Sequence, residues 1–358
     1  MVKRIVLTGG GTAGHVTPHF ALVPGLKDEG YEIHYIGTEN GIEHGLIAGS
    51  PDIAYHAIKS GKLRRYFSAR NFTDPFRVLM GVWQSMRLMR ALKPDVCFSK
   101  GGFVSVPVII ASWLFRVPIV CHESDITPGL ANRIGTAFAS RVAATFPECA
   151  QRLGQKAVFT GTPIRSEIFR GCREEGLVMA GFAGQKPVLL ITGGSQGAQS
   201  VNQCLRQALP DLLPRLDVLH LCGKGNLEAS LEGLEGYCQK EFLGAELPDA
   251  LAAADIVLSR AGSNTLSELL HLRKPMLLVP YPLEASRGDQ VLNAEYFQRH
   301  GIAHVLPQKD MNGQSLAGAL FNLLDHRADL DSAMARYPAR EGTEAVLGLI
   351  KEVQGRTA

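Results

Sequence analysis

The chain has 358 residues, of which 37 are basic, 34 are acidic and 46% are hydrophobic, and its formal net charge is +3. This length exceeds what one hydrophobic core usually supports, so it predicts two domains of roughly 150 to 200 residues each. The small net charge argues against a general nucleic-acid-binding protein, although it leaves room for a local basic patch.

The cysteine pattern and the apolar runs narrow the class of protein further. Seven cysteines are scattered without CxxC or paired-histidine spacing, which predicts neither a disulfide framework nor a structural zinc site. The N-terminus enters a predicted strand without a signal-peptide pattern, and no uninterrupted apolar run reaches about 18 residues. We therefore expect a cytosolic protein that does not span a membrane.

Short β-branched stretches alternate with helical stretches, which is typical of βαβ units in a parallel sheet. The first half has predicted strands over residues 5–8, 32–36, 53–58, 96–99, 118–121, 141–144 and 158–160. The pattern then begins again, with predicted strands over residues 187–192, 218–221, 241–243, 255–259, 276–279 and 303–306.

This repetition predicts an α/β protein with two Rossmann-like, doubly wound parallel-sheet domains that face each other across a ligand-binding cleft. We expect an N-terminal domain over residues 1–162 and a C-terminal domain over residues 163–339. The last predicted helix, within residues 340–358, is expected to pack back on the first domain.

The first predicted strand runs into Gly9-x-Gly11-x-x-Gly14, which matches the dinucleotide-binding fingerprint. A dehydrogenase also needs an acid after the second strand, and Glu39 lies about there. The same glycines equally suit a tight turn and close helix packing. His15 follows the loop and suits a general base at neutral pH, or alternatively a residue that caps or packs at the helix start.

Two further turns leave the same predicted sheet at strand ends. Gly102 and Phe103 lie in the turn of residues 100–105, and Glu123 and Asp125 lie in the turn of residues 122–129. Because loops at the carboxyl ends of parallel strands meet at one edge, we expect these turns to converge on the first glycine loop. Glu123 and Asp125 are candidates for chemistry, or alternatively for N-capping a helix predicted to begin near residue 128.

The second half offers a comparable set of anion-binding features. Its glycine loop, residues 193–197, presents backbone amides and the Ser195 hydroxyl at a helix start, which suits a phosphate group. Neither glycine loop has the lysine of a P-loop, so we do not expect nucleoside triphosphate hydrolysis. The helix predicted over residues 263–272 begins beside strand ends, where its amides and dipole suit a diphosphate, and a polar loop over residues 287–290 precedes the next helix.

Residues 62–93 carry eight basic side chains against one acidic side chain. Within them, four apolar residues recur at the spacing of one helix face: Phe76, Leu79, Met80 and Trp83. One interpretation is an ordinary core-facing stripe with a solvated basic face. The other is a membrane-surface patch, completed by Arg77 and Arg87, that binds anionic lipid.

Seven motifs occur in order across nearly the full chain: GGGTAGH, GGFVS, HESDITPG, TPIR, GGSQGA, SRAGSNTLSE and RGDQ. Together they resemble the MurG family, in a form similar to its Gram-positive members. The resemblance implies the two-domain GT-B fold and an inverting hexosyltransferase that uses UDP-N-acetylglucosamine. It implies transfer to the muramyl sugar of an undecaprenyl-diphosphate-linked muramyl peptide in peptidoglycan synthesis, by a peripheral protein at the cytoplasmic face of the cell membrane.

The same resemblance implies roles for individual residues. His15 would be the base or would anchor the acceptor diphosphate, and Glu123 is the companion candidate for the base. The backbone of Leu243 would read the uracil edge, and Glu268 would bind the ribose. The donor diphosphate and sugar would be bound by Ser195, Gln196, Ser263, Asn264, Thr265, Asp289 and Gln290, with Arg165 nearby. The acceptor and its diphosphate would be bound by Gly11, Thr12, Ala13, Gly14, Gly102, Phe103, Ser124 and Asp125.

Some positions depart from the pattern of many family members, among them Ala13, Phe103, Ser124, Asp125 and Asp289. Glu268 also has a structural alternative, because Thr265-x-x-Glu268 reads as a capping box. No tightly bound cofactor or essential metal is expected, since the one Asp-x-Asp, at residues 329–331, lies in a polar helical stretch. Competing hypotheses are another GT-B enzyme (a glycolipid synthase or a UDP-sugar epimerase), a nicotinamide dehydrogenase, and a non-catalytic nucleotide- or lipid-diphosphate-binding protein.

Overall fold

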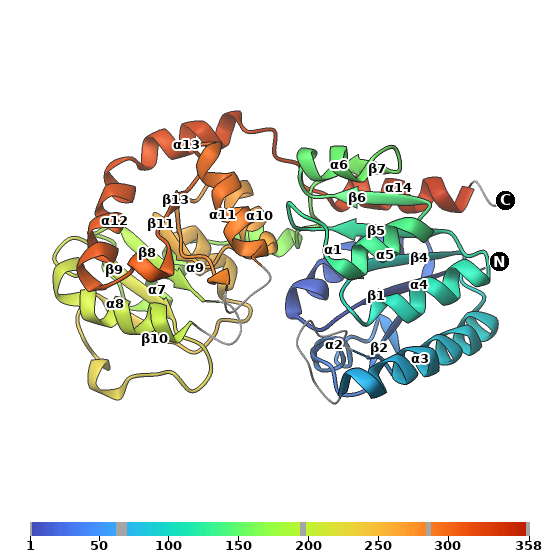
Figure 1. The fold of residues 1–358 in the computed structure, drawn as a ribbon. Helices are drawn as coiled ribbons and strands as arrows, with labels where there is room; N and C mark the ends of the chain where they lie inside the picture. Colours follow the sequence, from blue (N-terminus) through green and yellow to red (C-terminus); the bar gives the residue numbers. More distant parts are fainter. Residues whose placement is uncertain (1, 62–69, 194–197, 284–287, 356–358) are drawn as a thin grey trace. The chain divides into compact units, whose positions relative to one another are not determined.

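The computed structural model describes residues 2–61, 70–193, 198–283 and 288–355, and side chains within 70–75 are left out of the description. The chain forms two compact units, one of Met1–Arg165 with Arg340–Ala358 and one of Ser166–Ala339. Each unit is built on one parallel sheet with helices on its faces (Figure 1). The predicted α/β class with two Rossmann-like parallel sheets is confirmed.

The first unit has a seven-stranded sheet in the order β3-β2-β1-β4-β5-β6-β7. Its strands are β1 (Lys3–Gly9), β2 (Tyr31–Thr38), β3 (Ile53–Ile58), β4 (Val96–Gly101), β5 (Ile119–Glu123), β6 (Arg141–Ala144) and β7 (Ala157–Phe159). Its helices are the 3₁₀ helix η1 (Ala13–His15), α1 (Thr17–Asp28), α2 (Ile42–Ile47), α3 (Arg70–Leu92), α4 (Ser105–Leu114), α5 (Leu130–Phe138), α6 (Pro147–Leu153) and α14 (Thr343–Gly355).

The central strands of this sheet are continuous apolar runs because helices cover both of their faces. In β1, for example, Ile5, Val6 and Leu7 have no solvent exposure. The order of the strands reverses between β1 and β4, so the loops after these strands diverge to opposite faces. In open parallel sheets the crevice at such a reversal is where ligands bind.

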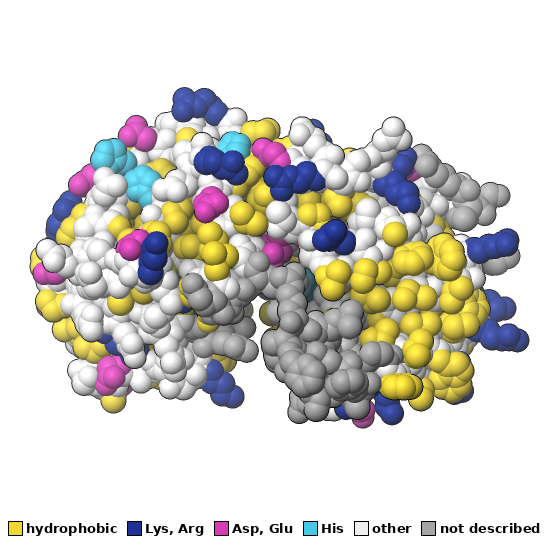
Figure 2. Space-filling view, viewed as in Figure 1, with side chains coloured by type: hydrophobic (Ala, Val, Ile, Leu, Met, Phe, Trp, Pro, Cys, Tyr) yellow, Lys and Arg dark blue, Asp and Glu magenta, His cyan; other side chains and the backbone are white. Residues whose placement is uncertain are grey.

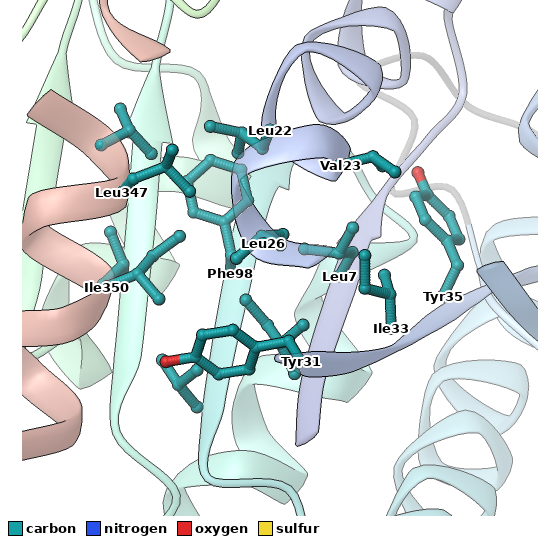
Figure 3. Packing of buried hydrophobic residues seen from close by; sticks show 14 of the residues in the cluster. Leu7, Leu22, Val23, Leu26, Tyr31, Ile33, Tyr35, Phe98, Leu347 and Ile350 are labelled. Carbon is teal, nitrogen blue, oxygen red and sulfur yellow. The ribbon is translucent and has the colours of Figure 1, made fainter. Parts of the chain in front are cut away.

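The last helix, α14, completes the core of the first unit (Figure 3). Leu347 and Ile350 pack with Leu22, Leu26 and Phe98, which come from α1 and β4. At Gly25 an added Cβ would lie 2.4 Å from Leu347 Cδ1, so any larger residue there would force the Leu347 side chain to move.

Polar contacts hold α14 at both of its ends. At the start, the Gly342 amide donates to the Thr162 carbonyl at 3.0 Å. Near the other end, Arg141 forms an ion pair with Glu352 at 2.9 Å. The segment after residue 339 is therefore part of the first unit's core, although it is far from that core in the sequence.

The second unit has a six-stranded sheet in the order β10-β9-β8-β11-β12-β13. Its strands are β8 (Val188–Thr192), β9 (Asp217–Leu221), β10 (Tyr237–Lys240), β11 (Ile256–Ser259), β12 (Met276–Leu278) and β13 (His304–Val305). Its helices are η2 (Ser166–Arg170), α7 (Arg173–Ala180), α8 (Gln199–Leu212), η3 (Ala229–Leu231), α9 (Leu247–Ala253), α10 (Ser263–His271), α11 (Asp289–Arg299), η5 (Gln308–Asp310), α12 (Gly313–Asp325) and α13 (Arg327–Arg336). Here the strand order reverses between β8 and β11.

Two predicted elements differ from the structure. The strand expected over residues 241–243 is wrong: the strand is β10, which ends at Lys240, and Phe242 is 69% exposed. Because β10 is an edge strand with half-buried side chains, it lacks the apolar pattern that marks its neighbours. The loop expected over residues 287–290 also ends earlier, since α11 begins at Asp289, directly after its N-cap Gly288.

The packing of α14 predicts that the C-terminal segment stabilises the first unit. Ile350 has no solvent exposure, so Ile350→Ala should lower the free energy of unfolding by about 2–5 kcal/mol, as other buried large-to-small changes do. Urea denaturation of the full chain measures this loss. Lys351→Ala, next along the same helix and exposed, is the matched control, and equal stability of the two variants would contradict the role given to α14.

Candidate active site

The glycine loops after β1 and β4 touch each other at the strand reversal of the first unit. An added Cβ on Gly102, whose φ is 82°, would lie 2.1 Å from the Gly10 carbonyl oxygen. An added Cβ on Gly11 would lie 2.6 Å from the Phe103 ring. Glycine is therefore required at Gly102 and Gly11 both by conformation and by space. The structure brings Gly11, Gly102 and Phe103 together, as the motif positions suggested.

His15 closes the short helix η1, directly after the first glycine loop. Its Nδ1 lies 2.8 Å from the Thr12 hydroxyl, which fixes the orientation of the ring. The imidazole is partly exposed, whereas the neighbouring His19 is fully buried. Of the predicted catalytic residues, His15 is thus the one that solvent, and so a substrate, can reach. Ala13 and Gly14 belong to the same turn and are also accessible.

Glu43 is a buried residue of this site that the motifs do not reveal. Its carboxylate accepts hydrogen bonds from the amides of Gly11, at 3.3 Å, and Thr38, at 3.0 Å. Its side chain has no solvent exposure. The carboxylate therefore shapes the first glycine loop and already occupies an amide that a dinucleotide pyrophosphate would need. Glu39, which the dehydrogenase hypothesis required, lies exposed just beyond β2.

The loop after β5 is organised around the buried carboxylate of Glu123. That carboxylate accepts hydrogen bonds from the Asp125 amide at 2.9 Å, the Gly129 amide at 3.1 Å and the Asn132 side-chain amide at 2.8 Å. Neither Glu123 nor Asp125 is the N-cap of α5, since that position belongs to Gly129 and has no side-chain cap. Glu123 instead fixes the path of the chain from the strand to the helix.

Lys100 was not predicted from the motifs, yet it lies in the same cluster. Its side chain has no solvent exposure, and its ammonium donates a hydrogen bond to the Ser124 hydroxyl. Burial raises the pKa of Glu123 and lowers the pKa of Lys100, while the two charges partly compensate each other. This pair of ionisable groups therefore lies buried beneath the loops around Ser124.

Beneath these loops, two buried histidines are neutral. His19 contacts Tyr35 and Phe98 edge-on, and burial lowers its pKa to about 3. His122 is bonded through Nε2 to the Gly161 carbonyl at 3.0 Å, and burial again lowers its pKa. Both imidazoles pack beneath the loops rather than present a titrating group to a substrate.

In the second unit, α10 carries four of the predicted donor-binding residues: Ser263, Asn264, Thr265 and Glu268. The first three form its first turn, after the N-cap Gly262, which supplies no capping side chain. Because the helix begins at Ser263, Thr265 lies inside it and the proposed capping box is not formed. Glu268 is partly exposed one turn further along.

The start of α11 brings Asp289 and Gln290 to the same region of the second unit. The Gln290 side-chain oxygen accepts a hydrogen bond from the Tyr281 amide at 3.1 Å, and Asn293 of α11 donates to the Ala261 carbonyl at 3.2 Å. The α10 loop, the segment after β12 and α11 are thus tied together. The Gln290 NH₂ group, a pure donor, is the end of the amide that this bond leaves for a ligand.

The remaining predicted donor residues lie outside this cluster. Leu243 is half-buried in the loop after β10, and Arg165 is the partly exposed last residue before η2. Ser195 and Gln196 lie outside the described residues, so their predicted contacts stay predictions. Within the described ranges, no group of His, Cys, Asp or Glu is placed to hold a metal ion.

The apolar stripe of α3 is on the surface, so the core-facing interpretation of this stripe is wrong. Phe76, Leu79, Met80 and Trp83 are between 44% and 74% exposed, and the Arg87 guanidinium lies 5.0 Å from the centre of the Trp83 ring. The buried face of α3 is a different one, which contains Gly81, Ser85 and Met89. In sequence, a stripe at helical spacing looks the same whichever way it faces.

Exposed apolar side chains also continue onto α4, which packs along α3. We call this set the apolar surface: Phe76, Leu79, Met80, Trp83, Trp113, Leu114 and Phe115. Figure 2 shows hydrophobic side chains gathered on the side of the first unit where α3 and α4 lie. Among the described helices, none is long and apolar enough to cross a bilayer.

Known proteins share both the sequence and the fold of this chain. Residues 5–144 match the glycosyltransferase family 28 N-terminal domain, and residues 188–347 match the C-terminal domain of that family. The UDP-N-acetylglucosamine--N-acetylmuramyl-(pentapeptide) pyrophosphoryl-undecaprenol N-acetylglucosamine transferase 3 of Bacillus thuringiensis is 50% identical over 98% of this chain and its own full length. The equivalent transferase of Lachnoclostridium phytofermentans is 51% identical over 99% of both chains.

A solved structure, that of Acinetobacter baumannii MurG, superposes with a TM-score of 0.78 and 25% identity, over 98% of this chain and 99% of that one. The fold and the family matches define a GT-B sugar transferase. The chain belongs to glycosyltransferase family 28. This membership decides against the dehydrogenase hypothesis, in agreement with the Glu43 carboxylate on the first glycine loop.

Because His19 is buried, we expect the folded protein to lose stability at acidic pH. The pKa of His19 is about 3 in the folded chain against an ordinary 6.5, so between these values the unfolded chain binds a proton that the folded chain does not. Stability is therefore lost as pH falls from 6.5 toward 3. His19→Phe, which cannot ionise, should show a shallower decline in urea denaturation. An identical decline in both proteins would contradict this origin.

Proposed function

We propose that this protein transfers N-acetylglucosamine from UDP-N-acetylglucosamine to the muramyl sugar of undecaprenyl-diphosphate-linked muramyl peptide. The observation that carries the proposal is a sequence identity of 50% and 51%, over nearly the full chain, with two transferases named for this reaction. The product is the disaccharide-lipid precursor of peptidoglycan, so the reaction belongs to cell wall biogenesis and supports cell division and cell shape.

The two units divide the substrates between them in this proposal. The second unit takes the UDP-sugar: the first turn of α10 faces the diphosphate, Glu268 binds the ribose, and Asp289 and Gln290 bind the sugar hydroxyls. The support is that α10 begins at an uncapped Gly262 and that its loop is tied to α11. The Leu243 backbone reads the uracil edge, Ser195 and Gln196 contribute to the diphosphate site, and Arg165 lies near the donor.

The first unit takes the lipid-linked acceptor. Gly11, Thr12, Ala13 and Gly14, with the Gly102-Phe103 turn and the Ser124-Asp125 loop, form its acceptor and diphosphate site. Support comes from the close packing of Gly10 on Gly102 and of Gly11 on Phe103. The buried Lys100 beneath Ser124 adds positive charge on the side where the acceptor's diphosphate would bind.

Inverting transfer needs a base for the acceptor hydroxyl and charge stabilisation for the departing diphosphate. We assign the base to His15, because its imidazole is accessible and oriented by Thr12. Glu123 is only 3% exposed, and its carboxylate accepts three hydrogen bonds from its own loop and helix. In this assignment, Glu123 contributes by holding the acceptor loop in its conformation through these hydrogen bonds.

The direct test is an assay of sugar transfer. The purified protein is incubated with UDP-N-acetylglucosamine carrying a radiolabelled sugar and with the lipid-linked muramyl pentapeptide, and labelled lipid is extracted and counted. We expect label in the lipid product. Absence of lipid-bound label with a protein that still binds the UDP-sugar would overturn the acceptor assignment, and transfer to a different lipid acceptor would favour another GT-B glycolipid synthase.

The same assay tests the base. His15→Ala should lower kcat by about 10²- to 10⁴-fold, the usual contribution of a positioned general base, and leave affinity for the UDP-sugar unchanged. The matched control is His300→Ala, which removes an exposed imidazole from α11's C-terminal end in the second unit. Full activity of the His15 variant would assign the proton transfer to another group.

We further propose that the apolar surface, with Arg77 and Arg87, rests on the cytoplasmic face of the cell membrane. Exposed apolar side chains beside basic ones are the composition of an interfacial anchor, in which each basic residue contributes about 1 kcal/mol against anionic lipid. The acceptor is a membrane lipid, so a peripheral anchor on the acceptor-binding unit brings the enzyme to its substrate.

Vesicle sedimentation tests this anchor. Trp83→Glu should weaken binding to vesicles that contain anionic phospholipid, because it places a charge where the ring would enter the interface, and should not change transfer to a water-soluble acceptor. Val178→Glu makes the same charge change at an 81% exposed apolar residue of the second unit and should bind like the wild type. Equal binding of all three proteins would exclude the surface as an anchor.

A further inference from the structure

A buried arginine lies beside the proposed donor site, and no acidic side chain among the described residues is paired with it. Arg260 directly follows β11 and is only 7% exposed. Its guanidinium donates to the Val279 carbonyl at 3.0 Å, the Pro280 carbonyl at 3.4 Å and the Ser200 hydroxyl at 3.2 Å. All three of these acceptors are neutral. A buried cation ordinarily requires an anionic partner, and the described residues form no ion pair with this one.

The hydrogen-bonding capacity of Arg260 is also not used up. A guanidinium has five N–H donors, and the Nε atom of Arg260 is buried with no hydrogen-bond partner in the part of the chain that the structure describes. The Tyr281 ring lies 4.4 Å from the guanidinium carbon, so the cation is covered by an aromatic face rather than by a carboxylate. Burial lowers the pKa of Arg260, but an arginine stays charged at neutral pH.

The charge of Arg260 also lies near the N-termini of two helices, α8 and α10. Ser200 is the second residue of α8, and Arg260 lies three positions before the start of α10. Neither helix has a capping side chain at its N-terminus, since the N-cap residues are Ala198 and Gly262. Helix N-termini carry partial positive charge and favour anions, whereas cations are favoured at C-termini. Arg260 therefore adds a full positive charge beside two helix N-termini, and the described residues form no ion pair with it.

We propose that Arg260 is a positioning residue that supplies the buried positive charge for the donor's diphosphate and holds the Ser200 hydroxyl and the Tyr281 ring in place around it. This inference rests on the proposed function. During transfer, the bond between the anomeric carbon and the β-phosphate oxygen breaks and its electron pair stays on that oxygen. The acceptor hydroxyl oxygen forms the new bond to carbon, and its proton goes to His15.

The charge of Arg260 favours both the bound diphosphate and the extra charge that it gains as UDP leaves. The hydrogen bond to Ser200 links this charge to α8, and the Tyr281 amide is in turn bonded to the Gln290 side chain, which is assigned to the sugar. One buried cation thereby connects the diphosphate end and the sugar end of the donor site.

The test compares UDP with uridine, which lacks the phosphates. Titration calorimetry measures UDP binding and saturation-transfer NMR measures uridine binding. Arg260→Met should weaken UDP binding by about tenfold to a hundredfold, as expected for a lost charge-assisted interaction, and leave uridine binding unchanged. Arg260→Gln, which removes the charge but keeps hydrogen-bond donors, repeats the test if the Met variant does not fold.

A matched control removes a similar interaction elsewhere in the unit. Arg215 follows the C-terminus of α8 and stacks on Phe321 at the same 4.4 Å, so Arg215→Met should bind both ligands like the wild type. Unchanged UDP binding in both Arg260 variants would overturn the inference, and so would equal losses for UDP and uridine, which would indicate a purely structural role. A wild-type protein that binds neither ligand would instead overturn the proposed donor, and this inference with it.

Discussion

The structure depends on one consequence of parallel β-sheets: the carboxyl ends of all strands meet at the same edge, where helices begin with unpaired amides. In each unit the strand order reverses once, between β1 and β4 and between β8 and β11. The loops at these two reversals hold most of the motifs that the sequence presents. A chain with two such sheets therefore has two edges suited to anions, one for each of the two substrates of the proposed function.

Both edges combine backbone amides with buried charge, but in opposite ways. In the first unit, the buried Lys100 and Glu123 act on each other electrostatically, so the positive charge of Lys100 has an acidic counterpart within the same cluster. In the second unit, Arg260 has no such partner among the described residues. A compensated pair mainly supports loop shape, whereas an uncompensated cation favours an anionic ligand. This contrast agrees with the proposed function, in which the first unit positions the acceptor sugar and the second unit releases a highly charged diphosphate.

The sequence predicts the fold well because central parallel strands are apolar on both faces and glycine turns mark their ends. It predicts less where the deciding contact is distant in sequence. Glu43 accepts a hydrogen bond from the Gly11 amide although it lies on helix α2, and Lys100 reaches Ser124 from strand β4. Neither residue stands at a motif spacing that identifies its role. The edge strand β10 was misplaced for a related reason, because a half-exposed strand has no strong apolar pattern.

The helices α14 and α3 show why burial has to be learned from the structure. Both have apolar residues at helical spacing, yet Leu347 and Ile350 are buried in the core whereas Phe76 and Trp83 are exposed. The difference is that α3 already has a packed face around Gly81 and Met89, where the backbone comes close to its neighbours. Its second apolar face cannot be core in the monomer. Exposed apolar area on this scale is uncommon unless something binds there, and the flanking arginines favour an anionic lipid surface over an uncharged partner.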